Sequence, residues 1–268
     1  MMDTEKPIAI LVPIFSCLES EFQLFLDDVV NQSGSLRIKI YFVVEEHSNS
    51  FDLPRCCEER LREIAQIDYQ FFFLSGHKGL GYALNFGLSQ IHEDLVVRQD
   101  IGDRMSSNRL CKIKNVAKQN LDAVVFYSQA YLIKNGEAVL SKSPASLRRL
   151  KMKLAFSNPI IHPTVALNLA SLRRLCVNYD NNLRFCEDLD LWLRLIKNNQ
   201  KFVLIDEPLV SYVRPLTVRK SANWSTNLQV RWKNFGSPNM LLSIVGVLAM
   251  LGFVLMPPAV KSFLYAKR

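Results

Sequence analysis

Up to Arg98, short apolar runs alternate with segments in which apolar side chains recur every three or four positions. Runs of the first kind predict buried strands, and segments of the second kind predict amphipathic helices. The predicted strands are 8–12, 38–44, 69–74 and 95–98, and the predicted helices are 19–32, 54–67 and 80–91. This alternation is typical of parallel βαβ units, in which helices cover both faces of the sheet and ligands bind at the carboxyl ends of the strands.

The pattern changes after Asp100. We expect helices over 107–119 and 189–198, a hairpin over 131–140 that turns at Asn135-Gly136, and strands over 123–127, 164–168, 202–205 and 209–212. A basic stretch precedes Asn158-Pro159 and consists of Arg148, Arg149, Lys151 and Lys153. These cations could meet phosphates, those of a membrane included, or form a solvated face.

The chain has 268 residues, 49% of them hydrophobic and 22% charged, as in ordinary globular proteins. Its net charge of +8 is confined to one end. No acidic residue follows Glu207, so 25 of the 33 Lys and Arg residues precede that point, against 25 acidic ones. We therefore expect a neutral catalytic domain over 1–215 and a basic, membrane-associating segment over 216–268.

Residues 240–260 of that segment contain no charged side chain. A membrane-spanning helix needs about 20 apolar residues, and Pro257-Pro258 shortens the helical part of this run. A span, a helix lying in the membrane interface and a core helix with basic ends all remain open. The N-terminal MMDTEKP does not resemble a secretory signal, so we expect the protein at the cytoplasmic face of the plasma membrane, with its cysteines as thiols.

Three acidic clusters end predicted strands or begin predicted helices. They are Glu45-Glu46, Asp100 with Asp103, and Glu187-Asp188. Each alone could cap a helix. Together, at successive edges of one sheet, they form the constellation expected around a nucleotide diphosphate and its metal ion.

Residues of about 6 to 215 resemble the bacterial family 2 glycosyltransferases that build O antigens, capsules and related polysaccharides. The resemblance is carried, in order, by ILVPIFS, FVVEEHS, HKGLGYALNFGL, RQDIGDRMS, NPIIHPTV and CEDLDLWLRL. Members of the family typically read close to VSVYN, LVDDGS, NKGLAKALNIGL, RMDADDIS, NPFNHPTV and YEDYDLWLRL at these places. The resemblance implies a GT-A fold, with a Rossmann-like, mostly parallel central sheet flanked by helices.

The resemblance also implies donor-binding residues. Glu45 and Glu46 stand where the family has two aspartates that hold the base and ribose of the nucleotide. Lys78 and Gly79 open a predicted helix, where free backbone N–H groups favour a phosphate. The donor-binding set implied by the matched motifs is completed by Pro13, Arg98 and Asp100.

Asp100, Gly102 and Asp103 replace the D-x-D-D pattern of the family, so that one carboxylate is missing at Gly102. Asp100 and Asp103 remain as ligands for Mn²⁺ or Mg²⁺, which would neutralise charge on the leaving nucleotide diphosphate. The loss at Gly102 weakens the metal prediction and leaves a catalytically silent, transferase-like subunit open as an alternative.

In CEDLDLW the resemblance makes Asp188 the catalytic base that deprotonates the acceptor hydroxyl in an inverting transfer. Glu187 would orient the acceptor, Asp190 would cap the helix, and His162 would line the acceptor side of the pocket. We thus expect transfer of a sugar from a UDP-linked donor to a lipid-linked glycan at a membrane. A dinucleotide-dependent oxidoreductase is disfavoured because no GxGxxG follows the first strand, and a nucleic-acid binder because the body is neutral.

Overall fold

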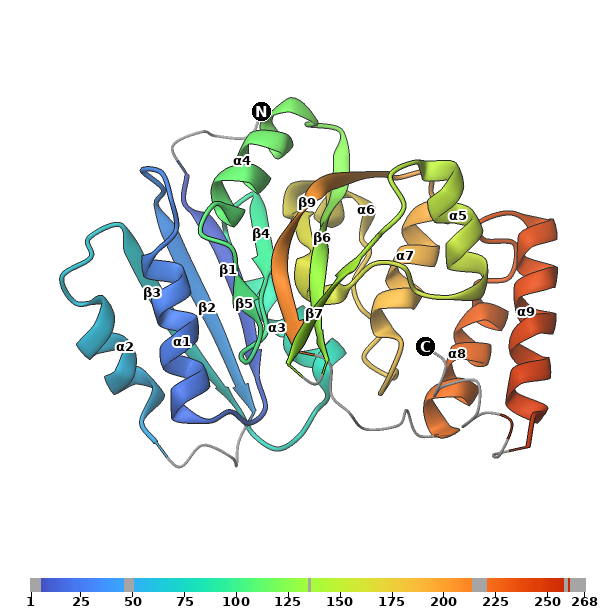
Figure 1. Ribbon diagram of the computed structural model, residues 1–268, viewed down its shortest axis with the longest axis horizontal. Helices are drawn as coiled ribbons and strands as arrows, with labels where there is room; N and C mark the ends of the chain where they lie inside the picture. Colours follow the sequence, from blue (N-terminus) through green and yellow to red (C-terminus); the bar gives the residue numbers. More distant parts are fainter. Residues whose placement is uncertain (1–5, 46–50, 135, 214–220, 258–259, 261–268) are drawn as a thin grey trace.

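The computed structural model of the chain describes residues 6–45, 51–134, 136–213, 221–257 and 260. A curled, mixed sheet in the strand order β3-β2-β1-β4-β8-β6-β9-β5, with β7 paired to β6, runs through the centre (Figure 1). Its strands are β1 (Ile8–Ile14), β2 (Ile38–Glu45), β3 (Ile67–Leu74), β4 (Leu95–Arg98), β5 (Arg104–Met105), β6 (Ala123–Lys134), β7 (Glu137–Ser141), β8 (Ala166–Asn168) and β9 (Lys201–Val213).

Two regions of the sheet differ in strand direction. Strands β3, β2, β1 and β4 are mutually parallel, so their carboxyl ends meet at one edge. Strand β8 runs antiparallel to both β4 and β6, while β6 and β9 are parallel to each other. We call the first region the parallel half and the rest, from β6 onward, the C-terminal half.

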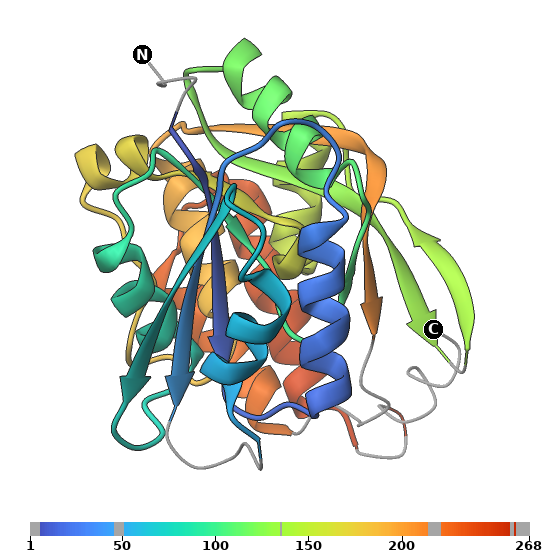
Figure 2. The ribbon, with the colours of Figure 1, turned by 90° about the vertical axis from the view of Figure 1, so that its left-hand side faces the viewer.

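Helices cover both faces of the sheet, as the βαβ alternation predicts. One face packs against α1 (Glu19–Val30), α2 (Leu53–Leu61) and α4 (Arg109–Gln119), and the other against α3 (Leu80–Gln90), α5 (Leu147–Phe156), α6 (Leu169–Leu175) and α7 (Glu187–Lys197). Figure 2 shows α1 and α3 on opposite sides of the strands.

Strand β1 shows why both faces are covered. Ile8, Ile10 and Val12 are buried on the α1 side, whereas Ala9 and Leu11 are buried on the α3 side. A strand apolar at every position has no solvent face. Strand β1, in the middle of the parallel half, is therefore covered on both faces.

Several expected boundaries were wrong. Helix α2 ends at Leu61 instead of residue 67, and the strands expected over 202–205 and 209–212 form the single strand β9. The register against β6 jumps from Ile205 to Pro208, so Asp206 and Glu207 form a bulge within one strand. Helices α5 and α6 were not predicted.

Helices α8 (Ser221–Lys233) and α9 (Met240–Leu255) pack beside α5 and α7. Gly246 of α9 lies so close to α5 that a Cβ atom would come within 2.1 Å of the Ala155 carbonyl oxygen. Arg231, expected in the basic flank of the apolar segment, is instead buried and donates to the Leu154 and Ala155 carbonyls at 2.6 and 2.5 Å. Its guanidinium thus caps the end of α5.

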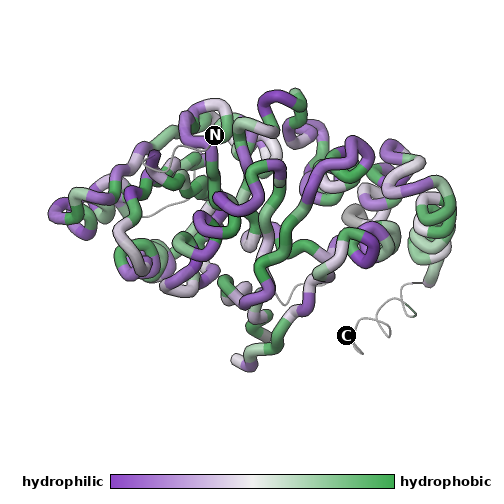
Figure 3. Tube along the Cα trace, turned by 90° about the horizontal axis from the view of Figure 1, so that it is seen from above, coloured by the Kyte–Doolittle hydropathy of each residue, from purple (hydrophilic) through white to green (hydrophobic). Residues whose placement is uncertain are grey.

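Helix α9 is apolar along its length (Figure 3). Its exposed apolar side chains are Met240, Leu241, Ile244, Val245, Leu248, Leu251 and Leu255. Within the described residues, none of the helices has the length and apolar character that crossing a bilayer requires.

Candidate active site

The carboxyl end of β2 contributes Glu45, whose side chain is buried. One carboxylate oxygen accepts the backbone N–H groups of Lys78 and Gly79, at 3.2 and 2.9 Å, and the other contacts Nδ1 of His77. The amides that were expected to be free for a phosphate are thus bonded to Glu45 here. Glu45 holds the loop between β3 and α3 in place, and the assignment of these residues to the donor stays a prediction.

Arg98 ends β4 and is buried, with its Nη2 atom 2.8 Å from a carboxylate oxygen of Asp100. Asp100 keeps 31% of its side-chain surface exposed. Burial lowers the pKa of Arg98, but Asp100, Tyr179 and the Glu187-Asp188 pair outweigh it and hold the pKa above its usual value. One guanidinium therefore joins the acid of the parallel half electrostatically to the two acids that open α7.

Asp103 lies deeper than Asp100. Its Oδ1 atom accepts the N–H of Val213 at the end of β9, at 3.0 Å, and its Oδ2 atom is buried without a hydrogen-bond partner. Burial, followed by the charge of Asp100, raises the pKa of Asp103 to about 7. Gly102, between the two acids, has a φ of +96°, a backbone conformation that an aspartate adopts only with strain.

Two buried residues below this loop hold its backbone. Gln99 donates through Nε2 to the carbonyls of Asp100 and Asp103, both at 3.0 Å. Arg109, fully buried at the start of α4, contacts Oε1 of Gln99 and donates to the Arg98 carbonyl at 2.8 Å. The loop that carries both candidate metal ligands is thus tied to α4.

The first turn of α7 carries the candidate base. Cys186 before it adopts a left-handed conformation, with a φ of 63°, and α7 then begins with Glu187 and Asp188. Asp188 is half-buried; Asn158 donates to its Oδ2 at 2.5 Å, and the N–H of Leu189 donates to its Oδ1 at 2.7 Å. The Asn158 amide thereby orients the carboxylate.

Glu187 and His162 form a buried pair behind Asp188, with Oε1 of the glutamate 3.8 Å from Nδ1 of the histidine. Burial and then the charge of Asp188 raise the pKa of Glu187 to about 7. Burial, with the nearby Arg98 charge, lowers the pKa of His162 well below its usual value, so its ring is neutral at pH 7. The Nε2 atom of His162 lies 2.8 Å from the hydroxyl of Tyr179.

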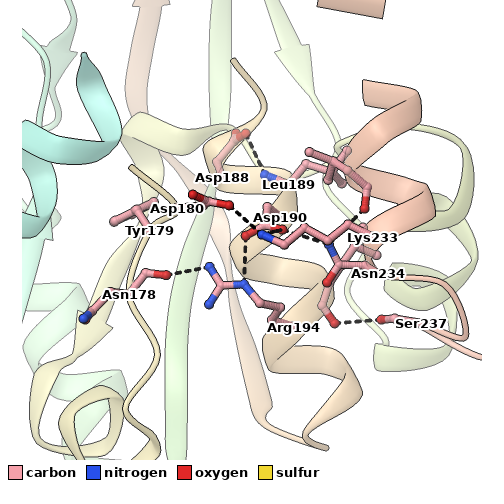
Figure 4. A network of polar contacts seen from close by, with 12 residues as sticks. Asn178, Tyr179, Asp180, Asp188, Leu189, Asp190, Arg194, Lys233, Asn234 and Ser237 are labelled. Atoms are coloured by element: carbon pink, nitrogen blue, oxygen red, sulfur yellow. Dashed lines mark hydrogen bonds and ion pairs between the residues drawn. The ribbon is translucent and has the colours of Figure 1, made fainter. Parts of the chain in front are cut away.

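Asp190 does not cap α7 as expected, because its carboxylate is fully buried and points to α8 (Figure 4). Its Oδ2 atom lies 2.8 Å from Nε of Arg194, while Oδ1 accepts from Asn234 at 2.8 Å and lies 3.5 Å from Nζ of Lys233. Lys233 also pairs with Asp180 at 2.6 Å. This network fixes the helix that carries Asp188 against α8.

The structure therefore brings Arg98, Asp100, Glu187, Asp188 and His162 into one electrostatically coupled site. Pro13 lies near the carboxyl end of β1, in register with Val43 of β2, whereas Glu46 lies outside the described residues. In the described part of the chain, no group of three or more His, Cys, Asp or Glu side chains is placed to hold a metal ion by itself.

Sequence reasoning did not single out Asn158, Tyr179 or Arg109. Asn158 stands in the matched NPIIHPTV segment, so that motif carried the signal. Arg109 and Tyr179 become recognisable only through their burial and their partners in the fold.

The chain is similar to known glycosyltransferases in sequence, although no protein-family model matches it. It is 23% identical over 245 residues to the uncharacterized glycosyltransferase MJ1057 of Methanocaldococcus jannaschii, covering 87% of this chain and 82% of that protein. It is 32% identical over 147 residues to the UDP-Gal:alpha-D-GlcNAc-diphosphoundecaprenol beta-1,3-galactosyltransferase of Escherichia coli. That match covers 52% of this chain and 53% of the galactosyltransferase, about half of each.

Two solved structures share the fold. S. aureus TarS 1-349 in complex with UDP-GlcNAc has a TM-score of 0.68 at 15% identity and covers 92% of this chain and 72% of that one. The mannosyltransferase PcManGT from Pyrobaculum calidifontis, in complex with GDP-Man and Mn²⁺, has a TM-score of 0.63 at 12% identity and covers 98% and 80%. Together the comparisons support a glycosyltransferase enzyme with a GT-A-like fold.

Proposed function

We propose that the chain is an inverting, family 2 type glycosyltransferase that moves a sugar from a UDP-sugar to a lipid-linked saccharide. The observation that carries this proposal is the pair of buried Arg98 with Asp100 after β4, together with the Glu187-Asp188 pair that His162 and Asn158 contact at the start of α7. A donor held at Asp100 and an acceptor hydroxyl held at Asp188 would then meet across one guanidinium.

The donor side fits a nucleotide diphosphate. The proposed donor residues Pro13, Glu45, Lys78, Gly79 and Asp100 lie at or just after the carboxyl ends of parallel strands, where ligands of such sheets bind. The UDP-GlcNAc complex of TarS, which shares this fold, supports a nucleotide-sugar donor.

A divalent cation fits the acids that remain after the loss at Gly102. Asp100 offers a part-exposed carboxylate, and Oδ2 of Asp103 has no hydrogen-bond partner. Mg²⁺ and similar ions are commonly held by one or two carboxylates plus substrate phosphates, so two acids suffice when the donor is bound. When bound, Mn²⁺ or Mg²⁺ would supply positive charge to the leaving diphosphate.

The chemistry of the step needs one base. Asp188 takes the proton of the acceptor hydroxyl as its oxygen bonds to the anomeric carbon, and the bond from that carbon to the nucleotide diphosphate breaks on the opposite side. Asn158 holds the Asp188 carboxylate in orientation, and neutral His162 with Glu187 closes the site behind it.

For the acceptor and its location, the support is the Escherichia coli galactosyltransferase, whose name gives a GlcNAc-diphosphoundecaprenol acceptor. We place the chain in bacterial surface polysaccharide (O-antigen or capsule) biosynthesis, at the cytoplasmic face of the plasma membrane. Residues 216–268 would associate with the bilayer, with the exposed apolar face of α9 on the lipid. Co-sedimentation with anionic vesicles, lost in Leu241→Ser/Leu248→Ser, tests this; equal sedimentation of that variant would refute it.

A thermal-shift panel with UDP-, GDP-, CDP- and dTDP-sugars, each with Mn²⁺ and with EDTA, tests the donor assignment. Binding stabilises the folded state by mass action, so a Mn²⁺-dependent rise in Tm with UDP-sugars alone is expected. The alternative is a catalytically silent subunit, which the missing carboxylate at Gly102 favours. Donor binding without turnover would support that alternative, and no shift with any nucleotide sugar would contradict the donor assignment.

A further inference from the structure

Beside the first turn of α7 lies a groove of about 540 Å³, bounded by the β6–β7 hairpin, α5 and the segment before His162. We call it the α5 groove. Its lining includes Leu132, Met152, Phe156, Lys142, Lys153 and Asn158.

The α5 groove ends at the candidate active site. Asn158 lines it and donates to Oδ2 of Asp188 at 2.5 Å. Tyr212 lines it too, and the next residue along β9, Val213, donates its N–H to Asp103. A molecule lying in the groove would therefore come close to Asp188, the candidate base, at the end that Asn158 lines.

The lining combines apolar surface with positive charge. Met152 and Phe156 stand 48% and 46% exposed. Lys142 and Lys153 are exposed and take part in none of the ion pairs found within the described residues; Nζ of Lys153 donates to the Lys142 carbonyl at 3.4 Å. Lysine ammonium groups are common phosphate ligands, and exposed apolar side chains favour a hydrocarbon.

The same two lysines also line a second pocket, of about 390 Å³, together with Arg149. The one carboxylate that lines this pocket is Asp206, and it already accepts from Nε2 of Gln129 at 2.8 Å. Positive charge thus dominates the ridge between the two pockets. Such a ridge attracts a multiply charged anion more strongly than a single lysine does.

The α5 groove and helix α9 share helix α5 as a neighbour. Helix α5, which supplies Met152 and Phe156, packs directly on α9 through Gly246 (Figure 1). The outer face of α9 exposes Leu241, Ile244 and Leu248.

We propose that the α5 groove binds the diphosphate and the first part of the lipid of a lipid-diphosphate-linked acceptor, with Lys142 and Lys153 on the diphosphate and Met152 and Phe156 on the hydrocarbon. This inference rests on the proposed transferase function. It assigns a separate subsite to the part of the acceptor that does not react. Binding energy from such a remote part positions the reacting hydroxyl at Asp188.

Binding of farnesyl diphosphate, measured by calorimetry with UDP and Mn²⁺ present to occupy the donor side, tests the subsite without turnover. Lys142→Gln/Lys153→Gln should weaken the affinity for farnesyl diphosphate about tenfold or more, because two charge-assisted contacts are lost. Lys118→Gln/Lys197→Gln removes the same charge from exposed positions elsewhere and should leave this affinity unchanged. Phe156→Ser should weaken farnesyl diphosphate but not inorganic diphosphate. Wild type that binds no farnesyl diphosphate, or equal affinities in the two lysine variants, would overturn the subsite.

Kinetics separate this inference from the proposed function. With wild-type protein, transfer to a saccharide-diphosphate-lipid and to the same saccharide as a methyl glycoside is compared. Lys142→Gln/Lys153→Gln should raise KM for the lipid acceptor about tenfold or more. The same variant should leave kcat and KM for the methyl glycoside unchanged. Equal losses on both acceptors would overturn the subsite alone. No transfer by wild type to either acceptor would overturn the proposed function, and the farnesyl diphosphate result would still decide the groove.

Discussion

Charged side chains have different surroundings in the parallel half and in the C-terminal half. In the parallel half, Glu45 accepts from the β3–α3 loop and Asp100 is paired with Arg98, so the acids are held by neighbouring backbone and side chains. In the C-terminal half, the α5 groove presents Lys142 and Lys153, for which the described part of the chain offers no ion-pair partner, beside exposed apolar side chains. The first arrangement suits a compact polar donor, and the second suits an amphiphilic acceptor. Asp188 at the start of α7 contacts Asn158, which lines the groove, and its charge acts on Arg98, the partner of Asp100.

We expect the largest effect at the first turn of α7, which carries Asp188. Asp188→Asn should lower kcat by about 10²–10⁴-fold and leave the affinity for the donor unchanged, because a general base acts only on the chemical step. Steady-state transfer kinetics and donor calorimetry measure the two quantities. Asp122→Asn, which changes an exposed acid paired with Lys201, is the control. Wild-type turnover in the Asp188 variant would remove the base assignment.

The packing of α7 against α8 depends on the buried contacts of Asp190. Asp190→Ala should lower the free energy of unfolding by about 3–5 kcal/mol, because it leaves Arg194 and Asn234 without their buried partner. Urea denaturation measures this quantity. Asp122→Ala breaks an exposed ion pair and should change the free energy of unfolding little. An equally small loss at Asp190 would mean that the network between α7 and α8 does not stabilise the fold.

A smaller effect concerns pH. The pKa of Glu187 rises from 4.5 to about 7 in the fold, through burial and then Asp188, while Arg98 opposes the rise and Asp100 adds to it. Between these pH values the unfolded chain binds fewer protons than the folded one, so stability falls as pH rises and then levels above about 7.

In wild type the free energy of unfolding should fall between pH 4.5 and about 7, and Glu187→Gln should make this fall smaller by about 1–3 kcal/mol. Burial, with the Arg98 charge, lowers the pKa of His162, which faces Glu187, so its titration shifts in the opposite direction. Free energies of unfolding measured from pH 4.5 to 8 check the difference between variant and wild type. Identical pH profiles would show that Glu187 titrates normally.

The two halves also differ in how far the sequence predicted them. The strand over 95–98 was predicted to the residue, and the starts of β1 and β2 were predicted correctly, because apolar runs mark strands buried on both faces. The start of helix α3 was also predicted correctly. Helix α5 was not predicted, because its cations obscured the apolar positions Leu147, Leu150 and Leu154. The groove it borders depends on contacts between segments far apart in the chain, which periodicity does not encode.

For the site, the order of matched motifs located Asp100, Glu187, Asp188 and His162, and the fold couples them through Arg98. The motifs carried no information on which acids were already bonded. Glu45 also binds the amides of the next loop, while its role toward a nucleotide stays a prediction. Asp190 was expected to cap α7, yet it is buried against α8. Residue identity at a position predicts the chemistry available, and the partners decide how it is used.

Sugar transfer itself can be followed by mass spectrometry of a reaction with wild-type protein, UDP-sugars, Mn²⁺ and a synthetic GlcNAc-diphosphate-lipid. We expect the acceptor to gain one sugar residue as UDP is released, and EDTA and Asp188→Asn each to suppress the product. An unmodified acceptor with every UDP-sugar, from a protein that still binds one of them, would contradict the proposed function and favour the silent-subunit alternative.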